Sequence, residues 1–211
     1  MRGSRASVTC ACVIALVASR AAAAQTPVPS RPFAVCLVLS DKLSISARAA
    51  DIVLAESNAI WMPFGVGVRR AEPSDESCDR LVSVKGDHEA LAEDVSSESA
   101  LGWVPFVEGR ARQLVFLRVG RARTLIDGLS PRTNPEAYTE FLVGRLLGRS
   151  LGHELGHILL NSRSHETVGL MRTRYRDRDV LTVPMSKYTL NAVERARLFA
   201  RMTGEPRLAA R

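Results

Sequence analysis

One stretch near residue 150 constrains the fold of this chain more than any other. His153, Glu154 and His157 form an H-E-x-x-H sequence, and a third histidine, His165, follows it. On an α-helix, residues four apart lie on one face, so His153 and His157 can reach a single metal ion. Histidine is scarce elsewhere, since the whole chain has four. The segment is therefore predicted to be a helix that ends soon after His157, so that the chain can return His165 to the same ion.

This set of side chains is typical of a catalytic zinc centre. Such a centre has three protein ligands and an open position for a water molecule. A glutamate directly after the first histidine can act as the general base toward that water. We therefore predict zinc as the cofactor, Glu154 as the catalytic residue, and three ligands, His153, His157 and His165.

The helix carrying this motif is expected to begin near Thr133 and to reach Leu160. The sequence Thr-Asn-Pro-Glu at residues 133–136 places a capping residue, a proline and an acid where a helix start favours them. Each glycine inside a helix costs about 1 kcal/mol relative to alanine. Nevertheless, glycines recur every four residues, at positions 144, 148, 152 and 156. A stripe of this kind on one face indicates close approach to another backbone, which we expect to be that of the sheet.

Strands and helices are predicted along the rest of the chain. Apolar runs and alternation indicate strands at residues 33–39, 65–68, 81–84, 101–107 and 113–119, a helix over 44–61, and a last amphipathic helix from near Thr189. Pro105 places the strand at 101–107 on a sheet edge, because proline cannot donate to a central ladder. Glu108-Gly109 indicates a hairpin turn. The predicted fold class is α+β: a twisted mixed sheet of about five strands with a backing helix and an active-site helix, plus a small irregular C-terminal lobe ending in a helix.

The first 24 residues are typical of a secretory signal peptide. Arg2 and Arg5 precede an apolar run at 8–18, and the alanines at 21–24 offer a cleavage site of small residues. The apolar run is too short to span a membrane. We therefore expect cleavage after Ala24, a secreted or periplasmic location without stable membrane insertion, and a single catalytic domain over 25–211, its N-terminal lobe at about 33–160 and its C-terminal lobe at about 161–211.

Removal of this leader changes the charge and the number of cysteines. Three arginines leave, so the formal net charge falls from +7 to +4. This mild excess does not indicate nucleic-acid binding. Of the four cysteines, Cys36 and Cys78 lie beyond residue 24. In an oxidising compartment they can form one disulfide, whereas an unpaired Cys36 would serve as a small apolar residue in a strand. A monomer is assumed.

The motif resembles that of the metzincin clan of zinc endopeptidases, whose signature is H-E-x-x-H-x-x-G-x-x-H followed by a methionine-containing turn. The four site residues match it in type and order, and Met171 matches the methionine of the turn. The resemblance spans most of residues 33–171. It implies a two-lobed domain with zinc at the floor of a cleft. It also implies that a substrate peptide lies antiparallel to the edge strand, here Gly102, Trp103 and Val104.

Two features depart from that signature. Seven residues separate His157 from His165, where the clan usually has five, and Leu160 occupies the position of the glycine that ends the helix. Asn161 comes next, and asparagine is the best residue after glycine for a left-handed helix end. We therefore expect the helix to turn one residue later, with a slightly longer loop that still delivers His165.

The sequence thus predicts an exported zinc-dependent endopeptidase acting on a protein or peptide substrate through a zinc-activated water, with Glu154 as general base. Two alternatives stay open. A gluzincin-type peptidase would use a downstream glutamate, Glu194, as third ligand in place of His165. A catalytically inactive exported zinc-binding module is the other, although a purely structural site needs no base. Two secondary candidates for the site are Glu166, which follows the third histidine, and Tyr175.

Overall fold

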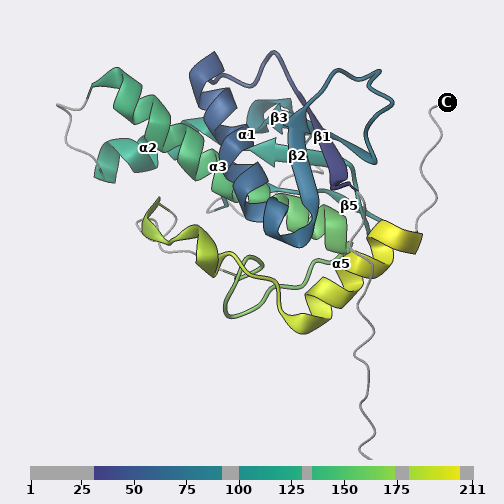
Figure 1. Ribbon diagram of the computed structural model, residues 1–211. Coiled ribbons are helices and arrows are strands. Elements are labelled where there is room, and N and C mark those ends of the chain that lie inside the picture. Colours follow the sequence, from purple (N-terminus) through teal and green to yellow (C-terminus); the bar gives the residue numbers. More distant parts are fainter. Residues whose placement is uncertain (1–30, 92–99, 130–134, 174–180, 205–211) are drawn as a thin grey trace, which may run out of the picture.

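A five-stranded mixed sheet forms the centre of the molecule (Figure 1). The computed structural model describes residues 31–91, 100–129, 135–173 and 181–204. The sheet order is β2-β1-β3-β7-β4. Its strands are β1 (Phe33–Leu39), β2 (Val66–Arg70), β3 (Arg80–Gly86), β4 (Gly102–Trp103) and β7 (Leu114–Leu117). The first, second, third and seventh strands pair in parallel, and β4 is antiparallel at the edge. The predicted fold class is confirmed.

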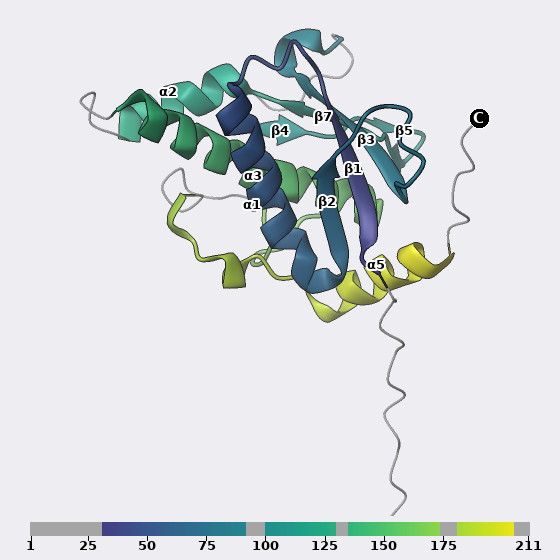
Figure 2. The same cartoon turned by 45° about the horizontal axis from the view of Figure 1, so that its top comes forward.

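Two long helices cover the same face of this sheet. Helix α1 (Ala47–Trp61) connects β1 to β2 and packs on β2, while α3 (Glu136–Leu160) packs on β7 and β4. The two helices also lie side by side in contact (Figures 1 and 2). The remaining described α-helices are α2 (Val119–Leu129) and α5 (Ala192–Gly204). The apolar core fills the space between sheet and helices, and fully buried side chains there include Val35, Leu37, Val84, Leu117, Leu147 and Leu151.

The glycine stripe of α3 faces α1, and the expectation that it approaches the sheet is wrong. A β-carbon at position 148 would lie 2.8 Å from the carbonyl oxygen of Val53, and one at 144 would lie 2.9 Å from that of Ala49. Trp61 of α1 also donates its indole N–H to the carbonyl oxygen of Gly152, over 2.9 Å. Both α1 and the sheet pack on α3, and α1 makes the more extensive contact. The glycines lack side chains where the backbone of α1 approaches α3.

The predicted strand at 101–107 is divided in the structure. Gly102 and Trp103 belong to the main sheet, whereas β5 (Phe106–Val107) pairs with β6 (Arg110–Ala111) in a separate two-stranded hairpin. Pro105 lies at the break, which agrees with its inability to donate to a ladder. The predicted turn at Glu108-Gly109 joins β5 to β6, with both residues at positive φ (50° and 75°). The edge position expected for this segment is confirmed for β4.

Helix α2 was not expected from the sequence, and α1 begins later than expected. The buried residues of α2, Val119, Ala122 and Ile126, have helical spacing, but Gly120 and Gly128 obscure the pattern because glycine disfavours helix interiors. Helix α1 begins at Ala47, since the hydroxyl of Ser46 caps it by accepting the N–H of Ala49.

A disulfide joins Cys36 of β1 to Cys78 in the loop before β3, across a sequence separation of 42. In the chain-entropy model, closing a loop of this length stabilises the fold by about 4 kcal/mol.

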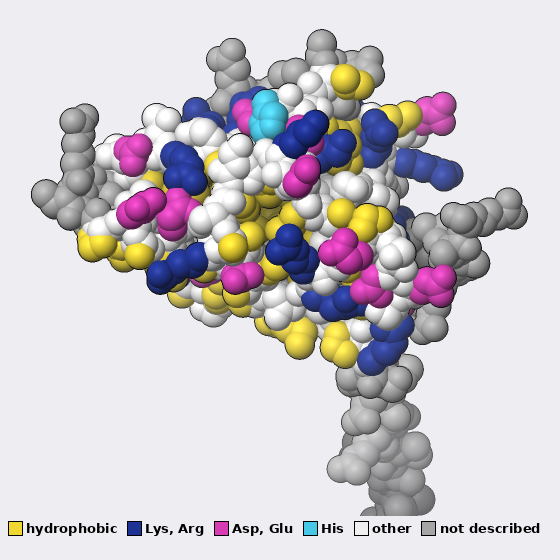
Figure 3. Space-filling model, turned by 90° about the horizontal axis from the view of Figure 1, so that it is seen from above, with side chains coloured by type: hydrophobic (Ala, Val, Ile, Leu, Met, Phe, Trp, Pro, Cys, Tyr) yellow, Lys and Arg dark blue, Asp and Glu magenta, His cyan; other side chains and the backbone are white. Residues whose placement is uncertain are grey.

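On the face seen from above in Figure 3, acidic and basic side chains are interspersed. Among the described residues, none of the helices combines the length and apolar character needed to cross a membrane. The proposed signal peptide lies outside the described residues.

The glycine stripe generates a test of the α1–α3 contact. Gly148→Ala should lower the free energy of unfolding by about 1–3 kcal/mol, because the new methyl group meets α1 backbone. Gly128→Ala in α2 is the matched control, since a β-carbon there meets nothing within 4 Å. It should raise stability by about 0.5–1 kcal/mol. Urea unfolding followed by circular dichroism measures both, and equal stabilisation by both substitutions would contradict the close helix contact.

Glu140 of α3 generates a pH prediction. Its carboxylate accepts a hydrogen bond from the Ser46 hydroxyl and pairs with Arg123 of α2 at 2.6 Å. The hydroxyl, followed by the guanidinium, lowers the pKa of Glu140 below its usual 4.5. This stability is present above pH 4.5 and is lost as pH falls through the lowered pKa. Glu140→Gln should therefore cost about 1–2 kcal/mol at pH 7, with the difference from wild type shrinking below pH 4.5 in a pH series of chemical denaturation. A stability difference between wild type and Glu140→Gln that does not change with pH would contradict this prediction.

Candidate metal centre

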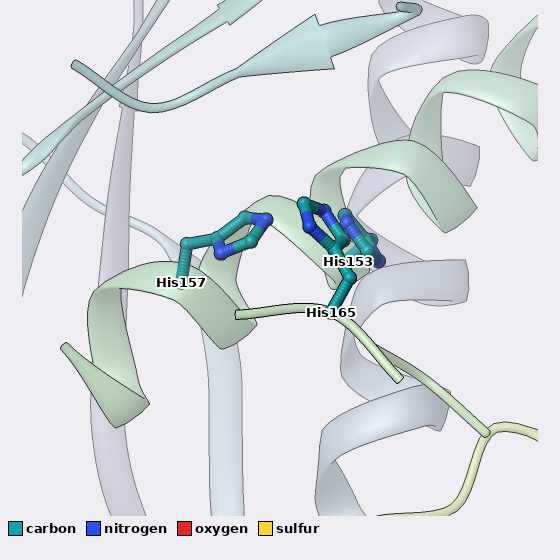
Figure 4. Close-up of side chains that lie close together, drawn as sticks. All are labelled: His153, His157 and His165. Carbon is teal, nitrogen blue, oxygen red and sulfur yellow. The ribbon is translucent and has the colours of Figure 1, made fainter. Parts of the chain in front are cut away.

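Three histidines converge at the end of α3 (Figure 4). His153 and His157 project from the last two turns of the helix, and His165 comes from the loop that follows. One ring nitrogen from each lies within 4.8 Å of the others. The ring centroids of His157 and His165 are 4.8 Å apart, and those of His153 and His165 are 5.3 Å apart. The structure therefore brings together all three predicted ligands.

Asn161 reverses the chain after α3 and makes this convergence possible. It adopts the left-handed conformation, with φ 46° and ψ 53°, as expected from the sequence. The N–H of Asn161 donates to the carbonyl of Ile158, and that of Ser162 donates to the carbonyl of His157. These bonds satisfy carbonyl groups that a helix end leaves without partners. The loop after this turn then carries His165 back to the helix.

Backbone carbonyl groups orient two of the imidazoles. Nδ1 of His153 lies 2.8 Å from the carbonyl oxygen of Leu170, and Nδ1 of His157 lies 2.6 Å from that of Ser162. A carbonyl oxygen only accepts, so Nδ1 must carry the proton and Nε2 is left with its lone pair. This is the arrangement that outer hydrogen bonds give to histidines that ligate a metal. Sequence reasoning missed these partners, because backbone carbonyls carry no signal in the sequence.

Met171 lies beneath the helix in a tight turn. It is buried, and its thioether packs so closely on Gly156 that a β-carbon there would collide with the sulfur. Gly169 makes the turn with φ 83°, and a β-carbon at that position would lie 2.5 Å from the carbonyl oxygen of Thr189. The same turn presents the Leu170 carbonyl to His153. The turn at residues 169–171 thus contacts the histidine-bearing helix through a backbone group as well as through packing.

The chemistry of the three histidines fits a zinc ion. Burial lowers the pKa of His153 to about 3 and that of His157 to about 4, and burial also lowers the pKa of His165. All three imidazoles are therefore neutral near pH 7, which is the form that binds metals. A tetrahedral zinc places nitrogen ligands about 3.3 Å from one another. The observed cluster needs only small side-chain movements to reach that spacing.

Glu154 is buried on the same helix, three residues before His157, so it neighbours that ligand. Burial by itself raises the pKa of its carboxyl to about 8, whereas a zinc ion held by the histidines would lower that pKa and favour the carboxylate form, which can act as a base. Within the described part of the chain this carboxyl group has no hydrogen bond and no ion pair. A buried acid without a protein partner is costly to folding and is typical of functional sites.

A hairpin that sequence reasoning did not connect to the site covers one side of it. The ring of Phe106 in β5 lies edge-on to His157, with centroids 6.4 Å apart. The backbone N–H of Ala111 in β6 donates to the side-chain oxygen of Asn161 over 2.9 Å. The guanidinium carbon of Arg163 lies over the Phe106 ring, 4.7 Å from its centroid. The turn signal at Glu108-Gly109 located this hairpin, but only the tertiary structure places it at the metal centre.

The predicted substrate-binding segment lies at the open edge of the sheet. β4 pairs with β7 on one side, and no strand of the described chain pairs with its other side. Gly102 faces α3, since a β-carbon there would lie 3.1 Å from the hydroxyl of Ser150. Trp103 therefore points to the opposite face, where it stacks on Phe116. Val104 follows the strand and is largely buried. The binding role of these residues stays a prediction.

The alternative and secondary candidates lie elsewhere. The carboxylate of Glu194 accepts the N–H of Asn191 over 2.8 Å and so caps α5. Among the described residues, the cluster that contains His153 and His157 includes His165 and not Glu194, which gives the gluzincin alternative no geometric support. Glu166 is exposed, and its backbone pairs with that of Arg172. Tyr175 lies outside the described residues.

The fold of this chain is similar to that of a solved structure. No protein-family profile matches the sequence. No curated protein sequence matches it either. The structure is similar to that of archaemetzincin from Methanopyrus kandleri, at 14% sequence identity and a TM-score of 0.46, covering 82% of this chain and 97% of that one.

The helix end generates a test of the site. Asn161→Ala should lower the free energy of unfolding by about 1–2 kcal/mol and weaken zinc binding, because alanine resists the left-handed conformation. Asn161→Gly retains the turn and loses only the bond to Ala111, so it should bind zinc more tightly than the alanine variant does. Competition with a chromogenic chelator measures both affinities. Equal losses would show that the hairpin bond, not the turn, supports the ligands.

Proposed function

We propose that this chain is a zinc-dependent endopeptidase that hydrolyses peptide bonds. One observation carries the proposal: three neutral imidazoles, two of them oriented by backbone carbonyl groups, lie within reach of one ion, beside a buried carboxyl group that has no partner among the described residues. A site that only stabilised the fold would close its coordination with a fourth side chain. Among the described residues, the cluster has three members.

The histidines, the glutamate and the backbone carbonyl groups of the site have separate roles. His153, His157 and His165 would hold the zinc ion, which when bound supplies Lewis acidity and lowers the pKa of water. Glu154 accepts a proton from the attacking water while the water oxygen bonds to the scissile carbonyl carbon. It then donates that proton to the nitrogen as the C–N bond breaks. The carbonyl groups of Ser162 and Leu170 keep the imidazole rings in position throughout.

The open edge of β4 supports an extended peptide as the substrate. A strand edge presents unpaired backbone N–H and C=O groups, and a peptide can bind there by adding a strand. Gly102 lies against Ser150, one turn ahead of His153 on α3. A peptide laid along β4 would therefore pass over the helix that carries the ligands.

We also propose that the protein acts outside the cytoplasm. The leader-like first 24 residues support export. The disulfide between Cys36 and Cys78 supports an oxidising compartment. Detection of the mature N-terminus at Gln25 in the secreted or periplasmic fraction would test this part of the proposal.

Glu154→Gln provides the direct test of the reaction. The variant keeps the size of the side chain and removes the base, so it should fold and bind zinc like wild type while losing at least about 100-fold in kcat. Cleavage of a peptide library with zinc present, followed by mass spectrometry, measures activity, and metal analysis measures zinc content. A chelator should abolish cleavage by wild type, and zinc should restore it.

Two results would overturn the proposal. Full activity of the zinc-loaded Glu154→Gln variant would exclude the assigned base. A wild-type protein that binds zinc tightly but cleaves no member of the library would favour the inactive zinc-binding module.

A further inference from the structure

The guanidinium group of Arg163 lies over the ring of Phe106, next to the candidate metal centre. The guanidinium carbon of Arg163 lies 4.7 Å from the centroid of the Phe106 ring. The same ring lies edge-on to His157, at 79° and 6.4 Å between centroids. A cation is attracted to the face of an aromatic ring. The ring of Phe106 therefore contacts both the positive charge of Arg163 and His157, a predicted zinc ligand.

The position of this stack is set by the end of α3. The hairpin that carries Phe106 is bonded to the helix end through the N–H of Ala111 and the side chain of Asn161. Within the segment, the N–H of Arg112 donates to the carbonyl of Pro105 over 2.9 Å. Arg163 comes two residues after Asn161 in the sequence. The same turn that returns His165 thus also places the cation.

The guanidinium of Arg163 is exposed and, within the described residues, forms no ion pair. Some other arginines form ion pairs, as Arg123 does with Glu140 and Arg149 does with Glu56. The neighbouring hairpin is also mainly basic, since it exposes Arg110 and Arg112 against one acid, Glu108. A planar guanidinium in this setting can bind a carboxylate through two parallel hydrogen bonds.

We propose that Arg163 determines substrate specificity by binding a carboxylate of the peptide close to the scissile bond, on the side toward the C-terminal end of α3. This inference rests on the proposed peptidase function and adds a substrate class to it, namely acidic peptides. The carboxylate comes either from an aspartate or glutamate side chain or from the C-terminus of the peptide. Both sources have the same chemistry and differ in where cleavage falls.

Matched peptides and charge variants test the proposal. Peptides with Glu, Gln or Lys at each position flanking the cleaved bond are made with an amidated C-terminus, and the Gln peptide is also made with a free one. Wild type should favour Glu, or the free C-terminus, over amidated Gln by roughly three- to tenfold in kcat/KM. Arg163→Met keeps an apolar stem on Phe106 and should lose this preference. Arg163→Lys should retain part of it, and Arg163→Glu should favour the Lys peptide.

Arg195→Glu, an exposed change on α5, is the control for net charge and should keep the wild-type preference. Equal rates for the Glu, Gln and free-terminus peptides in wild type would overturn the proposal, as would an unchanged preference in Arg163→Met. Preference for the free terminus alone would identify the carboxylate as terminal.

A binding measurement separates this inference from the proposed function. Fluorescence anisotropy of the same peptides with zinc-loaded Glu154→Gln needs no turnover. Tighter binding of a carboxylate peptide to this protein than to Glu154→Gln/Arg163→Met supports the role of Arg163, and equal affinities overturn it. If wild type cleaves nothing, the peptidase proposal fails, while this comparison still decides whether Arg163 binds carboxylates.

Discussion

The close approach of α1 to α3 is the contact on which the rest of the structure depends. Glycines in place of larger residues let the two backbones touch, as at Gly148 against Val53. The contact is also polar, because Ser57 and Trp61 of α1 donate hydrogen bonds to carbonyl groups of α3. Each glycine costs helix stability, which packing over the length of the helix offsets. The line of α3 across the sheet, and therefore the position of its last two turns, follows from this contact.

The candidate site lies at the end of the glycine stripe, where the glycines of α3 stop facing α1 and face the segment that follows α3. Gly156, the last glycine of the stripe, faces Met171 rather than the backbone of α1. The lobe is also fixed by Arg149, which is almost fully buried, pairs with Glu56 of α1 and donates to the carbonyl of Val183. A buried guanidinium is tolerated only with such partners. The helix and the segment that follows it are therefore held together at Arg149, before His153, and at Gly156, between His153 and His157.

The sequence predicted most of the fold and the three histidines that the structure brings together, and it failed where long-range contacts determine the structure. Strand β1 and the C-terminal end of α3 were predicted correctly because an apolar run and an asparagine after a helix are local signals. The helix begins at Glu136 with Pro135 as its N-cap, and the predicted cap, Thr133, lies outside the described residues. Asn161 was legible too, since its tolerance of positive φ is a property of the residue itself. Helix α2 was missed because its apolar residues are sparse and flanked by glycine. The division of residues 101–107 into two strands was missed because pairing partners, not propensity, determine which sheet a short strand joins.

The sequence by itself determined which residues could bind a metal and that the helix had to end at Asn161, because spacing on a helix and backbone preferences are local properties. Tertiary structure alone decided that α1 fills the glycine stripe and that two backbone carbonyls orient the imidazoles. It alone also placed Phe106 and Arg163 beside His157. These partners come from segments far apart in the chain, and their meeting depends on how the helix, the hairpin and the methionine turn pack together.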